Sequence, residues 1–266
     1  MTSPYDDQGE GPPIILLHGF PFNRSMWRNQ MDFLSEHGYR AIAPDLRGLG
    51  ENVGRTSGAD TVRPVPPAKM DDMARDVAAL MDELKIESAF ICGLSMGCYV
   101  AFEFLRLFPK RVRALIVCGP RAQGPDAAEK KAREGQAQRV LAEGMGIAVD
   151  SISTTLLAKQ TLDVKPEIVA RVREMVLRTD RQGAAAAQIG MAMRRDYADD
   201  LATVSVPTLI FAGSEDGVRK PEDAEFVHQR IKNSRLEVLI DAGHLMNMEQ
   251  AEEFNQRLDN FLKLIH

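Results

Sequence analysis

One serine of the chain stands in a setting that suits a nucleophile. Ser95 is the central residue of Gly93-Leu94-Ser95-Met96-Gly97, which follows an apolar segment typical of a strand and precedes a helical pattern. A strand-to-helix reversal this sharp exposes the serine hydroxyl at the end of a sheet, and the flanking glycines avoid collisions with the neighbouring strand and helix. A chain of this length contains the glycine-serine pattern by chance about one time in ten. Its place between a strand and a helix makes Ser95 the candidate nucleophile.

A serine hydroxyl reacts only when a base takes its proton and an acid orients that base. His244 follows a predicted strand, on a loop where the catalytic residues of such sheets collect. The acid should follow a strand that lies between the serine and the histidine in the sequence. Asp216 meets this condition and is favoured over Glu215, for which we expect a solvent-facing position. The other histidines end a strand or a helix, lie inside a helix, or end the chain: His18, His37, His228 and His266.

The elements that must position these side chains alternate along the chain. Short segments that are apolar throughout predict strands buried on both faces, at residues 14–17, 39–43, 88–92, 114–118, 207–212 and 235–240. Helical patterns lie between them, at residues 26–37, 70–84, 96–108, 221–231 and 249–264. The alternation predicts an α/β fold, with a mostly parallel central sheet flanked by helices.

Two stretches interrupt this alternation. Residues 46–68 are rich in glycine and proline and predict a long surface loop. Residues 120–202 carry no convincing strand but four helical patterns, near residues 126–143, 147–159, 166–178 and 183–195. We therefore predict a core domain of residues 1–119 and 203–266, with an all-helical cap at 120–202 that folds over Ser95.

Composition limits the partners and the compartment. The 266 residues include 33 basic and 38 acidic side chains, for a net charge of −5, and 44% are hydrophobic, as in ordinary globular proteins. The mild acidity argues against nucleic acid and membrane surfaces as partners, and no apolar run has the roughly 18–20 residues of a membrane span. Three cysteines and a polar N-terminus predict a cytoplasmic protein. No metal-ligand spacing or nucleotide loop is present, so we expect no cofactor, while monomer and homodimer both remain open.

Several motifs together resemble the α/β-hydrolase superfamily, within it the bacterial carboxylesterase and enol-lactonase-like group with a helical cap. The motifs are His18-Gly19-Phe20-Pro21, Asp45-Leu46-Arg47-Gly48-Leu49-Gly50, Gly93 to Gly97, Gly213 to Asp216 and Gly243-His244. The order Ser95, Asp216, His244 is that of nucleophile-elbow hydrolases. One departure concerns the start of the sheet, where the family usually has two antiparallel strands. Only about ten residues precede Ile14, so we expect a shortened sheet or a truncated start.

The resemblance implies an oxyanion hole formed by the backbone amides of Phe20 and Met96. Donors of this kind are each worth about 3–4 kcal/mol of barrier. The resemblance also implies a structural role for His18, at the turn that carries Phe20. A serine nucleophile argues against the haloalkane dehalogenases and epoxide hydrolases of this fold, which use an aspartate.

The residues of the substrate pocket are harder to predict. We expect an apolar acyl site formed by Phe20 together with Trp27, Met145, Met191, Met193 and Met246, although each methionine is about as well explained as helix core. Arg121, Arg194 and Arg195 are candidates for binding a substrate carboxylate, although a solvated or salt-bridged role is the more ordinary one for an arginine.

These observations favour a serine carboxylesterase that hydrolyses small to medium esters through an acyl-enzyme on Ser95. The alternative with the same chemistry is an enol-lactonase or a carbon–carbon bond hydrolase with a carboxylate-bearing substrate. Perhydrolysis or acyl transfer would use the same residues and differ only in what attacks the acyl-enzyme. A non-catalytic ligand receptor on this fold is the alternative from another class, and the complete triad argues against it.

Overall fold

A computed structural model describes residues 3–53, 66–150 and 152–265 of the chain. Its described strands form one sheet in the order β1-β3-β2-β4-β5-β6-β7, in which only β1 runs antiparallel to its neighbour. The sheet therefore confirms the predicted mostly parallel α/β fold. The strands are β1 (Tyr5–Gln8), β2 (Pro13–Leu17), β3 (Arg40–Pro44), β4 (Ala89–Leu94), β5 (Val112–Cys118), β6 (Thr208–Gly213) and β7 (Ser234–Leu239).

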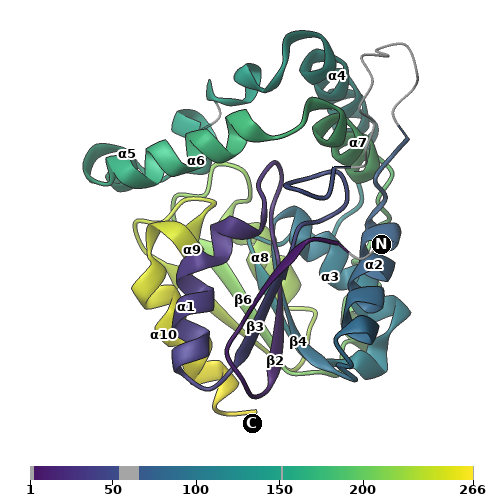
Figure 1. Cartoon of the computed structure of the whole chain (residues 1–266), viewed down its shortest axis with the longest axis vertical. Coiled ribbons are helices and arrows are strands. Elements are labelled where there is room, and N and C mark those ends of the chain that lie inside the picture. Colours follow the sequence, from purple (N-terminus) through teal and green to yellow (C-terminus); the bar gives the residue numbers. More distant parts are fainter. Residues whose placement is uncertain (1–2, 54–65, 151, 266) are drawn as a thin grey trace.

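Helices cover both faces of the sheet, which explains why its strands are apolar throughout. In β2, Ile15 and Leu17 pack into the core on one face, whereas Ile14 and Leu16 pack into the core on the other. Figure 1 shows the two groups of helices on opposite sides of the strands. The first group is α2 (Met70–Glu83), α3 (Met96–Leu107) and α8 (Pro221–His228), and the second is α1 (Arg28–Glu36), α9 (Met246–Glu249) and α10 (Ala251–Leu262).

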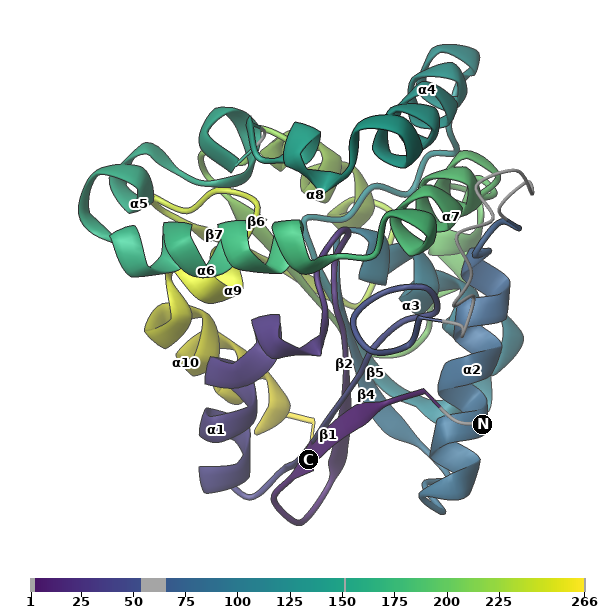
Figure 2. The same ribbon diagram turned by 45° about the horizontal axis from the view of Figure 1, so that its top comes forward.

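The segment between β5 and β6 forms a further layer of helices above the sheet (Figures 1 and 2). Its helix α7 is rich in small residues because it approaches the core backbone closely. A Cβ atom on Gly183 would lie 1.6 Å from the Gly48 carbonyl oxygen, and one on Gly190 would lie 1.9 Å from that of Ala68. The layer contains α4 (Ala127–Glu143), η3 (Met145–Ala148), η4 (Ile152–Leu156), α5 (Lys159–Val164), α6 (Pro166–Arg178) and α7 (Arg181–Ala192).

The structure differs from the predicted elements in three places. The helical pattern at residues 147–159 is divided among η3, η4 and the start of α5, because serine, threonine and β-branched residues disfavour a continuous helix there. The first strand, β1, was not predicted, because Tyr-Asp-Asp-Gln has no apolar pattern. It covers the edge of β3 as a single antiparallel strand. Of the predicted loop at residues 46–68, residues 54–65 lie outside the described residues. Among the described helices, none combines the length and the hydropathy of a membrane span.

Candidate active site

Ser95 occupies a strained position at the junction of β4 and α3. Its φ of 55° and ψ of −110° are unusual for a residue with a side chain. The two flanking glycines are required by close approach, since a Cβ atom on Gly93 would lie 2.3 Å from the Gly97 carbonyl oxygen. A Cβ atom on Gly97 would lie 2.2 Å from the carbonyl oxygen of Leu17 in β2. The predicted reversal therefore exists, and the sheet and helix hold it on both sides.

His244 and Asp216 form a buried hydrogen-bonded pair. The distance from His244 Nδ1 to Asp216 Oδ2 is 2.7 Å, and both side chains are almost fully buried. The other carboxylate oxygen of Asp216 accepts hydrogen bonds from the amides of Val218 and Arg219, at 2.8 and 2.7 Å. Because a carboxylate only accepts, Nδ1 carries the proton, and Nε2 of His244 is left as an acceptor.

Two loops at the same end of the sheet carry this pair. Asp216 lies just beyond β6 and His244 just beyond β7, while Ser95 lies just beyond β4. Ser95 and His244 line one cavity, so the structure brings the predicted nucleophile and base to a common space. Glu215 is exposed and accepts a hydrogen bond from the Lys159 amide, at 2.9 Å, away from the histidine.

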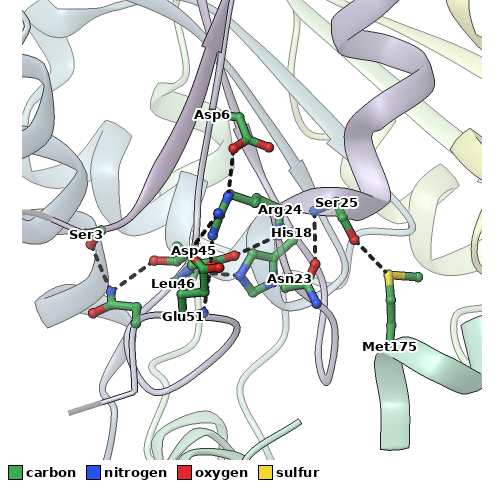
Figure 3. Close-up of polar contacts among 11 residues, drawn as sticks. Ser3, Asp6, His18, Asn23, Arg24, Ser25, Asp45, Leu46, Glu51 and Met175 are labelled. Carbon is green, nitrogen blue, oxygen red and sulfur yellow. Dashed lines mark hydrogen bonds and ion pairs between the residues drawn. The ribbon is translucent and has the colours of Figure 1, made fainter. Parts of the chain in front are cut away.

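His18 holds the turn that carries Phe20. Its Nδ1 donates to the Gly19 carbonyl oxygen, at 2.9 Å. Its Nε2 accepts from the Leu46 amide, also at 2.9 Å (Figure 3). Burial lowers the pKa of His18, which keeps the ring neutral in this arrangement. Both ring nitrogens are thus occupied, and His18 has none left for proton transfer.

A charged network supports the same turn. The Arg24 guanidinium pairs with three carboxylates at once, those of Asp6, Asp45 and Glu51 (Figure 3). Asp45 is fully buried and also accepts from the amides of Arg24 and Glu51, both at 2.8 Å. The loops after β2 and β3 are therefore fixed to each other directly beside Phe20.

The amides expected to form an oxyanion hole have no competing acceptor. Met96 is the first residue of α3, where an amide has no acceptor within its own helix. Within the described part of the chain, neither the Met96 amide nor the Phe20 amide donates a hydrogen bond to another residue. Both residues belong to segments that flank Ser95, so the two donors are available to a ligand.

Comparison with known proteins places this geometry in a family. Residues 12–251 match the model of a family described as the alpha/beta hydrolase fold. The chain belongs to the α/β-hydrolase family. A 3-oxoadipate enol-lactonase of Acinetobacter baylyi is 30% identical over 96% of this chain and 90% of its own. A solved thermophilic esterase from Thermogutta terrifontis, with malate bound, is 37% identical with a TM-score of 0.92, over 99% of this chain and 93% of its own. A non-heme haloperoxidase of Rhodococcus erythropolis is 28% identical over 97% of this chain and 95% of its own.

The cavity of this α/β hydrolase lies between the helical layer and the sheet. Its volume is about 550 Å³. Of the residues that the sequence suggests for a substrate pocket, Phe20, Arg121, Met145 and Met191 line it.

The structure puts Trp27, Met193 and Met246 outside the lining of this cavity. Trp27 is fully buried beside Phe254, with 6.3 Å between ring centroids, and Met246 is fully buried in α9. Met193 directly follows α7 and is 55% exposed. Two of the three arginines considered for binding a substrate carboxylate already have acidic partners. Arg194 bonds to Glu129, and Arg195 pairs with Asp200.

The sequence analysis missed most of the other lining residues, and three of these carry polar groups that could contact a substrate: Tyr99, Arg133 and Arg219. Tyr99 could have been found from helical spacing, because it lies four residues after Ser95 on the same face of α3. Arg219 follows Asp216 by three residues on one loop. Arg133 carried no signal, because a charged helix such as α4 ordinarily faces solvent.

Glu129 connects α4 to the segment that follows α7. Its carboxylate oxygens lie 2.9 and 3.0 Å from the Arg194 guanidinium, and Oε1 also lies 2.8 Å from Arg133. Burial opposes ionisation of Glu129, but the hydrogen bonds and charges of Arg194 and Arg133 outweigh it and lower its pKa from 4.5 to about 2. The Arg194 guanidinium also lies over the ring of Tyr99, 4.5 Å from the centroid.

The Glu129→Gln variant should be less stable at neutral pH, but not at low pH. Losing a charge-assisted pair costs about 2 kcal/mol, which corresponds to a Tm lower by roughly 4–8 °C. Because the folded-state pKa lies below the unfolded one, the stabilisation is complete above pH 4.5 and is lost as the pH falls toward about 2. Calorimetry of both proteins across this range checks the prediction.

The control is Glu174→Gln, which removes an exposed helical pair with Arg178. A Tm difference that does not change with pH would contradict the assignment.

Glu249 joins the histidine loop to the helical layer. Its Oε1 accepts from the amides of Gly243 and Leu245, at 3.0 and 3.1 Å, on either side of His244. Its Oε2 accepts from the Ala158 amide and the Thr161 hydroxyl, at 2.8 and 2.9 Å. Burial raises the pKa of Glu249, although these four donors oppose the shift.

The Glu249→Gln variant should lose about 2–4 kcal/mol of unfolding free energy, because an amide nitrogen cannot accept and leaves two buried donors unpaired. Urea unfolding followed by circular dichroism measures this loss. Glu253→Gln, which breaks only a surface pair with Arg257, should cost less than about 1 kcal/mol. Equal midpoints for the two variants would show that Glu249 does not fasten the loop.

Proposed function

We propose that this α/β hydrolase is a serine carboxylesterase that acts on small to medium carboxylic esters. The observation that carries the proposal is the buried 2.7 Å contact of Asp216 with His244, which lines the same cavity as Ser95. Cys98, which lies three residues after the serine, is a poor rival nucleophile. Cys98 is fully buried, its thiol contacts the Gly93 and Cys118 carbonyls, and burial raises its pKa far above the ordinary value.

In the proposed reaction the same groups act first in acylation of Ser95 and then in hydrolysis of the acyl-enzyme. His244 Nε2 takes the proton of Ser95 as its Oγ attacks the ester carbonyl, and Asp216 stabilises the imidazolium that forms. The amides of Phe20 and Met96 bind the oxyanion. His244 then protonates the leaving alcohol, and water activated by His244 releases the acid from Ser95.

The pocket supports acyl groups of modest size. Its volume of about 550 Å³ is in the range of small-molecule sites, and part of its lining is apolar, with Val140, Met145, Ile147, Leu156 and Val218. We propose that residues 120–202 act as a cap which forms this part of the site. The three buried thiols support a reducing compartment, the cytoplasm.

The proposal is tested by the hydrolysis of p-nitrophenyl esters from acetate to decanoate. We expect kcat/KM to be highest for the short and medium chains and to fall for the longest, because the cavity limits the acyl group. Turnover of a lactone by the same serine would extend the activity to cyclic esters, as the similarity to an enol-lactonase suggests. No hydrolysis of any ester would contradict the proposal and favour a ligand receptor.

A further inference from the structure

Two arginines that line the cavity have no carboxylate partner. Within the part of the chain that the structure describes, no hydrogen bond or ion pair reaches Arg121, and its Nε is buried. Among the described residues, the Arg219 guanidinium bonds only to neutral groups, the Val218 carbonyl at 3.0 Å and the Tyr99 hydroxyl at 2.8 Å. Its Nε is also buried without a partner. A buried N–H without an acceptor costs free energy, so both side chains are suited to an acceptor brought by a ligand.

The carboxylates of the cavity are already occupied. Glu129 is shared between Arg194 and Arg133, so that a single negative charge faces two positive ones. Asp126 is exposed and caps α4, where it accepts from the Glu129 amide at 2.7 Å. Neither of them bonds to Arg121 or Arg219. This side of the cavity therefore carries an excess of positive charge in a chain whose net charge is −5.

Arg219 lies near the reacting groups. Tyr99 follows Ser95 by one helical turn, which places their Cβ atoms roughly 6 Å apart. The Tyr99 hydroxyl binds the Arg219 side chain, while the Arg219 amide binds Asp216. An anion held by Arg219 would therefore lie in the same cavity as a carbonyl attacked by Ser95.

We propose that Arg121 and Arg219 form a carboxylate subsite, and that the preferred substrate is a monoester of a short dicarboxylic acid. This inference rests on the proposed ester hydrolysis and names its substrate class. Planar guanidinium groups bind a carboxylate through paired, charge-assisted hydrogen bonds. We propose a short acid because Tyr99, whose hydroxyl binds Arg219, lies one helical turn after Ser95.

The first experiment compares two esters that differ only in charge, mono-p-nitrophenyl glutarate and its neutral methyl ester. The ratio of their kcat/KM values, anionic over neutral, should be well above one for the parent protein. In Arg121→Gln and in Arg219→Gln this ratio should fall by about 10–100-fold, the worth of a charge-assisted hydrogen bond. Glutamine removes the positive charge and keeps a polar side chain, and a Tm measurement on each variant checks that the fold persists.

Arg139→Gln is the matched control, because Arg139 lines the same cavity but already pairs with Glu143, at 3.0 Å. Its ratio should stay within about threefold of the parent value. Equal ratios in the parent, Arg121→Gln and Arg219→Gln would overturn the carboxylate subsite, while hydrolysis of both esters would leave the proposed function intact.

A binding measurement separates the two proposals if neither ester is turned over. Titration calorimetry of glutarate against the parent protein should show binding that weakens about tenfold or more in each of the two variants, and not in Arg139→Gln. Such a result would support the subsite even if ester hydrolysis failed. Absence of glutarate binding to the parent, together with no preference for the anionic ester, would overturn it.

Discussion

Replacement of Ser95 by alanine is expected to lower kcat for p-nitrophenyl butyrate by about 10⁴–10⁶-fold, the range seen when the nucleophile of a serine triad is removed. The fold should persist, because the strained backbone of residue 95 is held by its neighbours rather than by the hydroxyl. The Ser95 amide donates to the Cys118 carbonyl at 2.9 Å, and its own carbonyl accepts from the Cys98 amide at 2.9 Å. Steady-state kinetics and a Tm measurement on the same preparation separate the two effects.

The control is Ser205→Ala, an exposed serine in the segment between η5 (Asp200–Thr203) and β6. Its kcat should equal that of the parent protein. Ester hydrolysis by Ser95→Ala at the parent rate would contradict the acyl-enzyme mechanism. Cys98 or a bound water would then have to be the nucleophile.

The parts of the fold that could be predicted are those whose signal is local. Each buried strand is a short apolar segment because both faces of the sheet are covered, and the predicted strands lie within two residues of β2 to β7 at both ends. The strand β1 gave no such signal. An edge strand pairs with one neighbour only, so Tyr5–Gln8 can be polar and still be held by β3.

The candidate site divides in the same way. The placement of Ser95, Asp216 and His244 at one end of the sheet could be predicted, because each lies on the segment that follows its own strand. The pocket could not, because its lining depends on how α4 and α7 dock on the core. Met191 lines the cavity, while Met193, two residues further along, is exposed, and sequence alone does not determine which way the end of α7 faces.

Pairing also decides which arginines remain free for a ligand. Sequence analysis treats Arg121, Arg194 and Arg195 alike, yet Arg194 and Arg195 bond to Glu129 and Asp200. These partners lie 65 and 5 residues away in the sequence, on segments whose approach depends on tertiary structure. Arg219 replaces them as a candidate because the turn that binds Asp216 also directs it into the cavity.

The second large effect is expected for Asp216→Asn, which should lower kcat by about 10⁴-fold while changing KM little. An asparagine amide can donate to Nδ1 of His244, which moves the ring proton to Nε2. The imidazole then has no acceptor for the Ser95 proton, although its position is unchanged. The Val218 and Arg219 amides still find an acceptor in the remaining oxygen, so the loop should keep its conformation.

Glu215→Gln is the control for Asp216→Asn, because it removes a carboxylate from the adjacent residue of the same loop. Glu215 is exposed and bonds to the Lys159 amide rather than to His244, so its loss should change kcat by less than about threefold. A large loss in Glu215→Gln with an active Asp216→Asn would transfer the role of the acid to Glu215. Equal, small losses in both would mean that His244 needs no carboxylate partner, and the buried 2.7 Å contact would then be structural rather than catalytic.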